Sequence, residues 1–109
     1  MTKGAYLGEF EMLVLISIGR LGDDAYAVTI KREIERRAKR GASIGAIHAA
    51  LGRLADKGYV DFRISDPLPV PGGRARKYAT ITSAGSRALR SSVGAIGRML
   101  DGLELGVEL

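Results

Sequence analysis

The sequence predicts a mainly α-helical domain with one small β hairpin. Three observations support this fold class. Apolar residues recur at helical spacing in four segments, the spacing changes to two residues on either side of a single loop, and all three prolines lie in that loop. Because proline cannot continue a helix or a central strand, the loop separates two strands. At 109 residues the chain is long enough for one domain with a modest core.

The domain is organised around a helix expected at residues 43–57. Ser43 is a suitable N-cap, because its hydroxyl can accept a hydrogen bond from a free backbone N–H in the first turn. Gly58 can adopt the left-handed conformation that ends a helix. The apolar stripe of this helix consists of Ile47, Leu51 and Leu54. Its other face has little bulk and one full charge, and carries Gly45, His48, Ala49, Gly52 and Arg53. Such a face can approach the major groove of DNA, although an ordinary surface helix with small residues also fits.

The positive charge of the chain is concentrated in its middle. The net charge is +5, but residues 31–90 hold fourteen Lys and Arg against five Asp and Glu, and the remaining residues carry −4. A basic protein that is merely soluble would not need this asymmetry. The distribution therefore favours a basic surface that faces one partner, as in proteins that bind nucleic acid.

Two helices are expected before this one, at residues 7–21 and at about 27–39. The second has an apolar face and an outer face dense in charge. Two ion pairs are expected within it, in the favourable order and four residues apart: Glu33–Arg37 and Glu35–Lys39. A basic stripe also recurs every four residues, at Arg32, Arg36 and Arg40. Two interpretations of the stripe are open, an ordinary solvated face and a surface that contacts phosphates. We prefer the solvated face. The short turn at Gly41 then joins two helices as in a helix-turn-helix.

The segment 59–81 is expected to form a wing of two strands. Val60, Phe62 and Ile64 alternate with charged residues and predict a half-buried strand. The proline-containing loop follows, and alternation resumes at residues 74–81. The second strand begins with three cations, Arg74, Arg76 and Lys77. They stand where a wing meets DNA backbone or minor groove, although exposed strands are also basic to discourage edge pairing.

A last helix is expected at residues 83–109, with Thr82 as its N-cap. Its apolar residues are spaced alternately four and three apart, the pattern of a coiled-coil seam, and comprise Leu89, Val93, Ile96, Leu100, Leu103 and Val107. The other helices already suffice to cover a small core, so the seam suggests pairing between two chains. The alternative is packing on the first helix of the same chain, and one interface could serve both.

The residue inventory disfavours catalysis and metal binding. The chain has no cysteine, one histidine, no paired-carboxylate motif and no Walker or dinucleotide phosphate loop. We therefore expect no enzyme, no metal and no cofactor. The first residues lack a signal peptide's apolar region, and the longest apolar run is too short to span a bilayer. A cytoplasmic protein is expected.

In order, these elements make a winged helix-turn-helix at residues 1–82 and a dimerisation helix at residues 83–109. The chain resembles the PadR-type bacterial transcriptional regulators along nearly its whole length, with the short last helix of the smaller members. The resemblance rests on three stretches: Leu7-Gly8-Glu9-Phe10-Glu11 with Leu13 and Leu15; Gly45-Ala46-Ile47-His48-Ala49-Ala50-Leu51-Gly52-Arg53-Leu54 with Lys57-Gly58; and Gly72-Gly73-Arg74-Ala75-Arg76-Lys77-Tyr78 with Thr80-Ile81-Thr82 and Ala84-Gly85.

The resemblance implies a homodimeric repressor that binds a palindromic operator and is released by a small effector. The residues it places at base edges are Ser43, Gly45, Ala46, His48 and Ala49. Those it places at phosphates are Arg53, Arg74, Arg76 and Lys77. The effector it implies is a small, often aromatic, molecule between the first and last helices. Tyr6, Phe10 and Met99 are candidates to line such a site, although ordinary interface packing accounts for them better.

Four positions depart from the family's pattern. His48 stands where a tyrosine is usual and Gly52 where a larger polar residue is common, and both bear on which bases are read. Ala79 replaces an aromatic residue, which leaves room in the core or in a pocket, and Ala27 replaces a glycine. The sparse outer face of helix 43–57 keeps another interpretation open, a non-specific DNA- or RNA-binding winged helix or a protein-interaction module.

Overall fold

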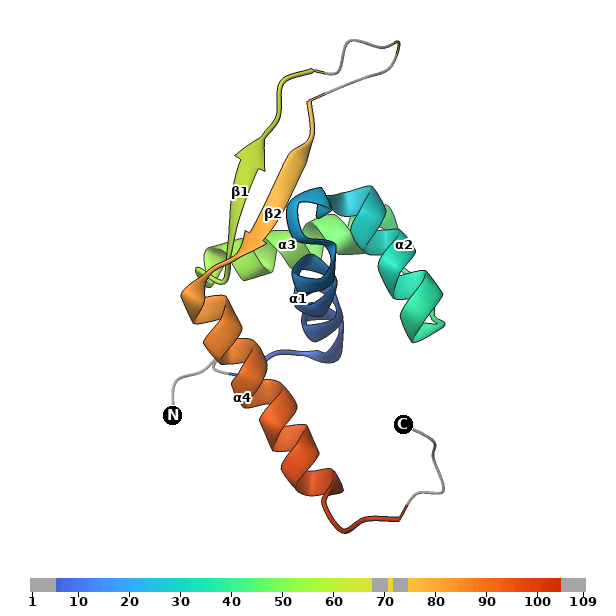
Figure 1. The fold of residues 1–109 in the computed structure, drawn as a ribbon, viewed down its shortest axis with the longest axis vertical. Coiled ribbons are helices and arrows are strands. Elements are labelled where there is room, and N and C mark those ends of the chain that lie inside the picture. The colour runs from blue at the N-terminus through green and yellow to red at the C-terminus, as the bar shows by residue number, and fades with distance from the viewer. Residues whose placement is uncertain (1–5, 68–70, 72–74, 105–109) are drawn as a thin grey trace.

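The computed structural model describes residues 6–67, 71 and 75–104, and these form a mainly helical fold with one antiparallel hairpin. The elements in chain order are α1 (Glu9–Leu21), the 3-10 turn η1 (Gly22–Asp24), α2 (Ala27–Ala38), α3 (Ile44–Asp56), β1 (Val60–Ile64), β2 (Lys77–Ile81) and α4 (Ser83–Leu100). Figure 1 shows the hairpin projecting from one end of the molecule and α4 from the other, with α1, α2 and α3 between them. The predicted fold class is confirmed.

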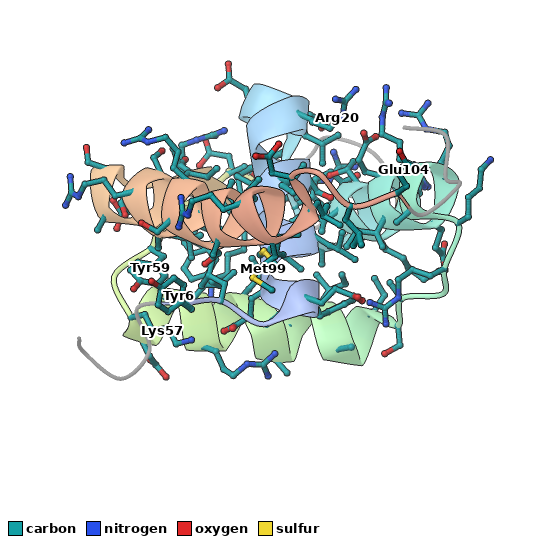
Figure 2. All side chains as sticks on the ribbon, turned by 90° about the horizontal axis from the view of Figure 1, so that it is seen from below. Tyr6, Arg20, Lys57, Tyr59, Met99 and Glu104 are labelled. Carbon is teal, nitrogen blue, oxygen red and sulfur yellow. The ribbon has the colours of Figure 1, made fainter. Side chains whose placement is uncertain are left out.

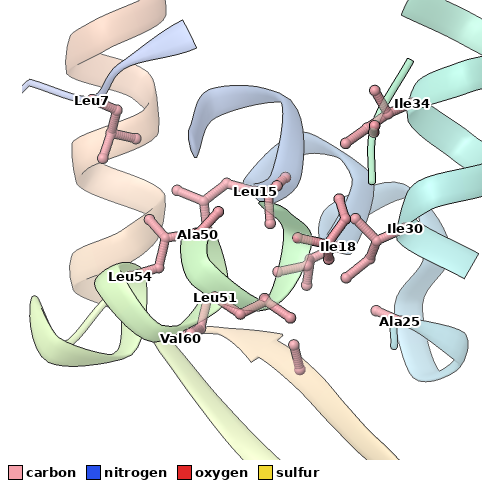
Figure 3. Close-up of a cluster of buried hydrophobic side chains, with 14 of the residues drawn as sticks. Leu7, Leu15, Ile18, Ala25, Ile30, Ile34, Ala50, Leu51, Leu54 and Val60 are labelled. Carbon is pink, nitrogen blue, oxygen red and sulfur yellow. The ribbon is translucent and has the colours of Figure 1, made fainter. Parts of the chain in front are cut away.

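The core is built around α1. Val14 and Leu15 of α1 are completely buried, and this helix contacts α2, α3, β2 and α4. Figure 3 shows buried side chains from several elements meeting in one cluster, among them Leu15, Ile18, Ile30, Leu51, Leu54 and Val60. The apolar stripe predicted for residues 43–57 therefore faces this core. The opposite face of α3 is exposed to solvent.

The ends of α3 and α4 are fixed as the sequence predicts. The hydroxyl of Ser43 accepts a hydrogen bond from the N–H of Ala46 at 3.1 Å, and that of Thr82 accepts one from the N–H of Gly85 at 3.0 Å. Gly58 follows α3 with a φ of 78°, the left-handed conformation that favours glycine. The Thr82 hydroxyl also donates to the carbonyl of Gly58 at 2.7 Å. The end of α3 is thereby joined directly to the start of α4.

The hairpin has a register that separates a core face from an outer face. Phe62 lies opposite Ala79, and Arg63 lies opposite Tyr78. Directly opposed residues share a face of the hairpin, so the first pair faces the core and the second pair faces away. The N–H of Ala79 donates to the carbonyl of Ala25 at 2.8 Å and ties the hairpin to the start of α2. Ala79 also lines a hollow of about 260 Å³ between the hairpin and α1, in line with the room expected from its small side chain.

Two local expectations about α2 and β2 are wrong in detail. Glu35 pairs with Lys31 at 2.8 Å and not with Lys39, because Lys39 leaves the helix with a left-handed φ of 57°. The second strand begins at Lys77 and not at residue 74. Among the described residues, pairing extends beyond it through Ser65, whose N–H donates to the Arg76 carbonyl at 2.8 Å and whose hydroxyl accepts from the Arg76 N–H at 2.9 Å.

The last helix is shorter than predicted. It ends at Leu100, and Gly102 adopts a φ of 76° in the turn that follows. Leu103, expected in the seam, therefore lies beyond the helix, and Val107 lies outside the described residues. With 18 residues α4 is the longest of the described helices, and none of them is both long and apolar enough to cross a membrane.

A buried carboxylate joins α1 to the C-terminal end of α3. The side chain of Glu11 is only 9% exposed, accepts from the N–H of Gly8 at 3.1 Å and lies 3.0 Å from Nζ of Lys57 and 3.6 Å from Nε of Arg53. Burial alone would raise the pKa of Glu11, but the hydrogen bonds from Gly8 and Lys57 and the charges of Lys57 and Arg53 together lower it. The charged form of this carboxyl group is therefore the one the fold stabilises.

Replacing Glu11 by Gln should destabilise the domain by about 2 kcal/mol at pH 7, because the charged hydrogen bonds to Lys57 are lost inside the fold. Since the pKa of Glu11 is lowered on folding, the wild-type contribution is complete above the ordinary glutamate pKa of about 4.3. It is lost as the pH falls through the lower folded-state value. Urea unfolding between pH 3 and pH 7, roughly the window set by these values, measures both effects. The control is Glu9→Gln, because Glu9 is 77% exposed in its pair with Arg40. Equal losses for the two variants would contradict the role given to Glu11.

Candidate nucleic-acid interface

The outward face of α3 is smooth and poor in hydrogen-bonding groups. The predicted base-contacting residues are all exposed and lie together at its N-terminal half, namely Ser43, Gly45, Ala46, His48 and Ala49. A Cβ atom added at Gly45 or Gly52 would meet nothing within 4 Å. The helix can therefore approach another surface closely, with His48 as its only long polar side chain on this face.

Arg53, unlike the other predicted phosphate contacts that the structure describes, forms an ion pair with a buried carboxylate of the same chain. Its Nε lies 3.6 Å from the buried carboxylate of Glu11, on the side of α3 that faces α1. About half of the Arg53 side chain is exposed. The structure therefore separates Arg53 from His48 and the wing, and gives it a structural ion pair.

At the base of the wing, cations are stacked on aromatic rings. The guanidinium of Arg76 lies 4.6 Å from the ring centroid of Tyr26, that of Arg63 lies 4.6 Å from the ring of Tyr78, and Nζ of Lys77 lies 3.9 Å from the ring of Phe62. The two tyrosine rings meet edge to face at 5.5 Å. These contacts hold the cations in place without neutralising them.

Arg76 also contacts the hydroxyl of Tyr78, which is 3.5 Å from its Nη1. This hydrogen bond is the main reason why the pKa of Arg76 is raised further above its ordinary value. Sequence reasoning identified Arg76 and Lys77 but missed Arg63 and the two tyrosines. The alternation of the strands contained a signal for Arg63, because it shares a face with Tyr78 once the register is known.

A groove of about 490 Å³ runs between the start of α2, the outward face of α3 and the hairpin. Its lining residues are Tyr26, Ala27, Val28, His48, Leu51, Gly52, Phe62, Ala75, Arg76 and Lys77. No carboxylate is among them. The structure therefore brings three of the predicted contacts, His48, Arg76 and Lys77, to one surface. Arg74, predicted beside them, lies outside the described residues.

The basic stripe of α2 is largely paired within the chain. The carboxylate of Glu33 is 7% exposed and lies 2.7 Å from Arg36, 2.7 Å from Arg37 and 2.9 Å from Arg20. The hydrogen bond from Arg20 is the largest cause of the lowered pKa of Glu33. The predicted Glu33–Arg37 pair is thus confirmed. Arg40 pairs with Glu9 at 3.0 Å. These contacts support the interpretation of the stripe as a solvated face.

One continuous apolar stripe runs along α4. In the first half of the helix it packs on the chain's own body, where Ala88 is buried and Leu89 is half-buried. In the second half it is uncovered, and the exposed fractions reach 46% at Val93, 47% at Ile96 and 80% at Met99. Figure 2 looks at this side of the molecule, with α4 crossing in front of α1.

A hollow of about 520 Å³ lies between α1 and α4. It is lined by Ile16, Leu89, Arg90, Val93 and Gly94. The residues predicted to line an effector site are placed elsewhere: Phe10 lies 5.2 Å below the guanidinium of Arg40, and Tyr6 and Met99 are exposed. Among the described residues, no group of three or more acidic or histidine side chains is placed to hold a metal ion.

Sequence comparison finds no protein-family model that matches the chain and no curated protein similar to it. Structural comparison does find similar proteins. A PadR family transcription regulator from hypervirulent Clostridium difficile is 22% identical, with a TM-score of 0.70 over 86% of this chain and 96% of that one. A PadR family regulator from Eggerthella lenta is 20% identical, with a TM-score of 0.67 over 87% and 82%.

Bacillus subtilis PadR, solved in complex with operator DNA, is 15% identical, with a TM-score of 0.61 over 87% of this chain and 61% of that one. In each case the match includes most of the present chain. The hairpin, the three packed helices and the projecting last helix are therefore arranged as in these proteins. The chain has the winged-helix fold of the PadR family transcription regulators.

Proposed function

We propose that this protein is a sequence-specific regulator of transcription of the PadR type, which binds double-stranded DNA through the outward face of α3 and the wing. The observation that carries the proposal is the groove in which His48, Arg76 and Lys77 converge and no carboxylate takes part. A smooth helix beside stacked cations suits a polyanion with a groove wide enough to admit a helix. The Bacillus subtilis protein with the same fold was solved with operator DNA. The helix enters the major groove, and the cations contact phosphates.

The active form is a homodimer. The partner that covers the second half of α4 is a second copy of this chain, because the uncovered apolar residues continue a stripe already buried on α1. A coiled-coil-like stripe is self-complementary about a two-fold axis. The pairing residues are Leu89, Val93, Ile96 and Leu100, with Leu103 just beyond the helix. A two-fold dimer presents two α3 helices and so requires a palindromic operator.

The protein acts in the cytoplasm as a repressor that a small effector releases from the operator. The hollow between α1 and α4 supports this part of the proposal, because its lining is mostly apolar and includes Leu89 and Val93 of the pairing stripe. A ligand bound there would alter how α4 packs on α1, and with it the separation of the two α3 helices. The contacts to such a ligand come from Ile16, Leu89 and Val93 rather than from Tyr6, Phe10 and Met99.

The test is selection of bound duplexes from random-sequence DNA at about 150 mM salt, where non-specific binding is weakened. The expected result is enrichment of a palindrome with half-sites about 10 bp apart, one helical turn. A protein that retains DNA without enriching any sequence would have only a non-specific role. A protein that retains no duplex would lack the proposed function.

A non-specific DNA- or RNA-binding role is the second candidate, and the face of α3 favours it. Apart from Ser43, which caps the helix, His48 is the one hydrogen-bonding side chain of the predicted base-reading set. Competition between the selected duplex, an unrelated duplex and a structured RNA separates the two candidates.

Replacing His48 by Ala should change which sequence is enriched while leaving non-specific affinity nearly intact. His48 lines the groove and its imidazole can hydrogen-bond a base edge. Loss of the preference at one base pair corresponds to about 1–3 kcal/mol, the usual cost of one mismatched base pair. The measurement is affinity for the selected duplex and for all its single-position variants. An unchanged preference would remove His48 from the reading surface.

The double substitution Arg76→Ala and Lys77→Ala should weaken binding to all sequences by a similar factor. Each phosphate contact contributes about 0.9 to the slope of log affinity against log salt, so the slope should fall by up to about 2. The matched control is Arg87→Ala with Arg98→Ala, which removes the same charge from exposed positions on α4. Equal effects of the two pairs would mean that only the net charge matters.

A further inference from the structure

The groove beside α3 contains one feature that phosphate binding does not explain. Its wing side carries Arg76 and Lys77, but beyond Tyr26 the first turn of α2 presents the aliphatic side chains of Ala27 and Val28. Val28 of α2 is 37% exposed there, on the same groove surface as His48 and Gly52 of α3. An aliphatic side chain gives nothing to a phosphate. It is suited to an apolar group.

Val28 shares the lining of the groove with Gly52 of α3, a position without a side chain. Gly52 lines the groove, and a Cβ atom added there would meet nothing within 4 Å. A larger residue at this position would extend into open space beside α3. The glycine therefore leaves the groove that Val28 lines less filled.

The backbone around Val28 is held rigidly. The neighbouring Thr29 is buried, and its hydroxyl accepts from the N–H of Tyr26 at 3.0 Å and contacts the carbonyls of Asp24 and Tyr26. Ile30 is completely buried in the core. The first turn of α2 therefore presents Val28 in one fixed position, which a discriminating contact needs.

In the major groove of DNA the apolar group that a protein can contact is the C5-methyl group of thymine. We infer that Val28 is a specificity-determining residue that packs against a thymine methyl in each half-site, with His48 bonding to a neighbouring base edge. This inference rests on the proposed function, because it requires α3 to lie in the major groove. The outward face of α3 has few side chains that can contact bases, and Val28 supplies one more from α2.

The test compares thymine with deoxyuridine, which differs only by lacking the methyl group, at each thymine of the selected operator. Wild-type protein should bind about fourfold more weakly when the contacted thymine is replaced in one half-site, the factor expected for one buried methyl group, and about 15-fold more weakly when both half-sites are changed. Val28→Ala should bind the thymine operator about as weakly as wild type binds the deoxyuridine operator. It should show no discrimination at that position and unchanged discrimination elsewhere.

Two further variants complete the experiment. Ile64→Ala removes another exposed aliphatic side chain, on β1 and outside the groove lining, and should keep the thymine preference. Val28→Thr has almost the same shape but replaces one methyl group by a hydroxyl, and if Val28→Ala fails to fold it should show reduced discrimination at the same position. The inference is overturned if wild type is indifferent to deoxyuridine at every thymine, or if the Val28 variants keep full discrimination. Enrichment of no sequence by wild type is a different result, and it removes the proposed function as well.

Discussion

Gly85→Ala should cost the domain about 3 kcal/mol of stability, the upper part of the range for overpacking a tight contact. A Cβ atom at Gly85 would collide with the backbone carbonyl oxygen of Tyr59 and come within 3.0 Å of Cγ2 of Ile81. The carbonyl oxygen cannot move away, because it accepts the N–H of Thr82 at 3.0 Å. The strain must therefore be relieved by shifting α4 as a whole.

Denaturant unfolding measures this loss, and Gly52→Ala is the matched control. Gly52 also lies within a helix, but a Cβ atom there meets nothing within 4 Å. Because alanine is the better helix former, the control should be more stable than wild type by about 0.5–1 kcal/mol. A Gly85→Ala variant as stable as the control would show that the contact between α4 and Tyr59 is not tight.

In the proposed complex with DNA, the same contact links stability to recognition. Tyr59 follows Gly58 directly at the end of α3, and Thr82 bonds to the carbonyls of both residues. The first turn of α4 is therefore fixed against the last turn of α3. In the proposed dimer this junction sets the angle between the pairing helix and the helix that enters the major groove. Any Gly85→Ala protein that still folds should bind the selected operator, with its half-sites at their natural spacing, more weakly than wild type does.

Much of the fold was predictable because local chemistry and apolar spacing agreed. Ser43, Gly58 and Thr82 cap or end helices where the sequence indicates. The structure differs from the sequence prediction where a residue can adopt either of two backbone conformations. Lys39 was expected to continue α2 and pair with Glu35, but it ends the helix in a left-handed conformation, and Lys31 forms the pair.

The candidate site was less predictable, because its contacts join residues distant in the chain. Charge and spacing placed His48, Arg76 and Lys77 among the candidates, and the fold brings them to one groove. The pattern of charge did not reveal that Arg53 is held by Glu11, 42 positions earlier in the sequence. Nor could it assign Val28 to the groove, since an exposed valine in a helix has no signature of its own. Such assignments depend on how α2 packs beside α3.

Val93→Asp should convert the proposed dimer into a monomer and weaken operator binding by about 100-fold or more, since two linked half-site contacts gain at least this factor over one. Val93 is 46% exposed in the single chain and stands where the stripe of α4 passes from its packed half to its uncovered half. A carboxylate there would be buried without a counter-charge on pairing, whereas in the monomer it remains in water. The folded monomer should therefore keep its stability and lose only the association.

The prediction is checked by measuring molar mass in solution, thermal unfolding and affinity for a full palindrome and a single half-site. Ser91→Asp introduces the same charge at an exposed position of α4, outside the seam, and should remain dimeric.

If Val93→Asp loses affinity for the palindrome but keeps that for one half-site, α4 acts by joining two DNA-binding faces. If the variant remains a dimer with full affinity, the partner of the uncovered stripe is not a second copy of this chain. A variant that is monomeric yet binds the palindrome as tightly as wild type would place recognition within one chain, and would separate the DNA-binding proposal from the dimer.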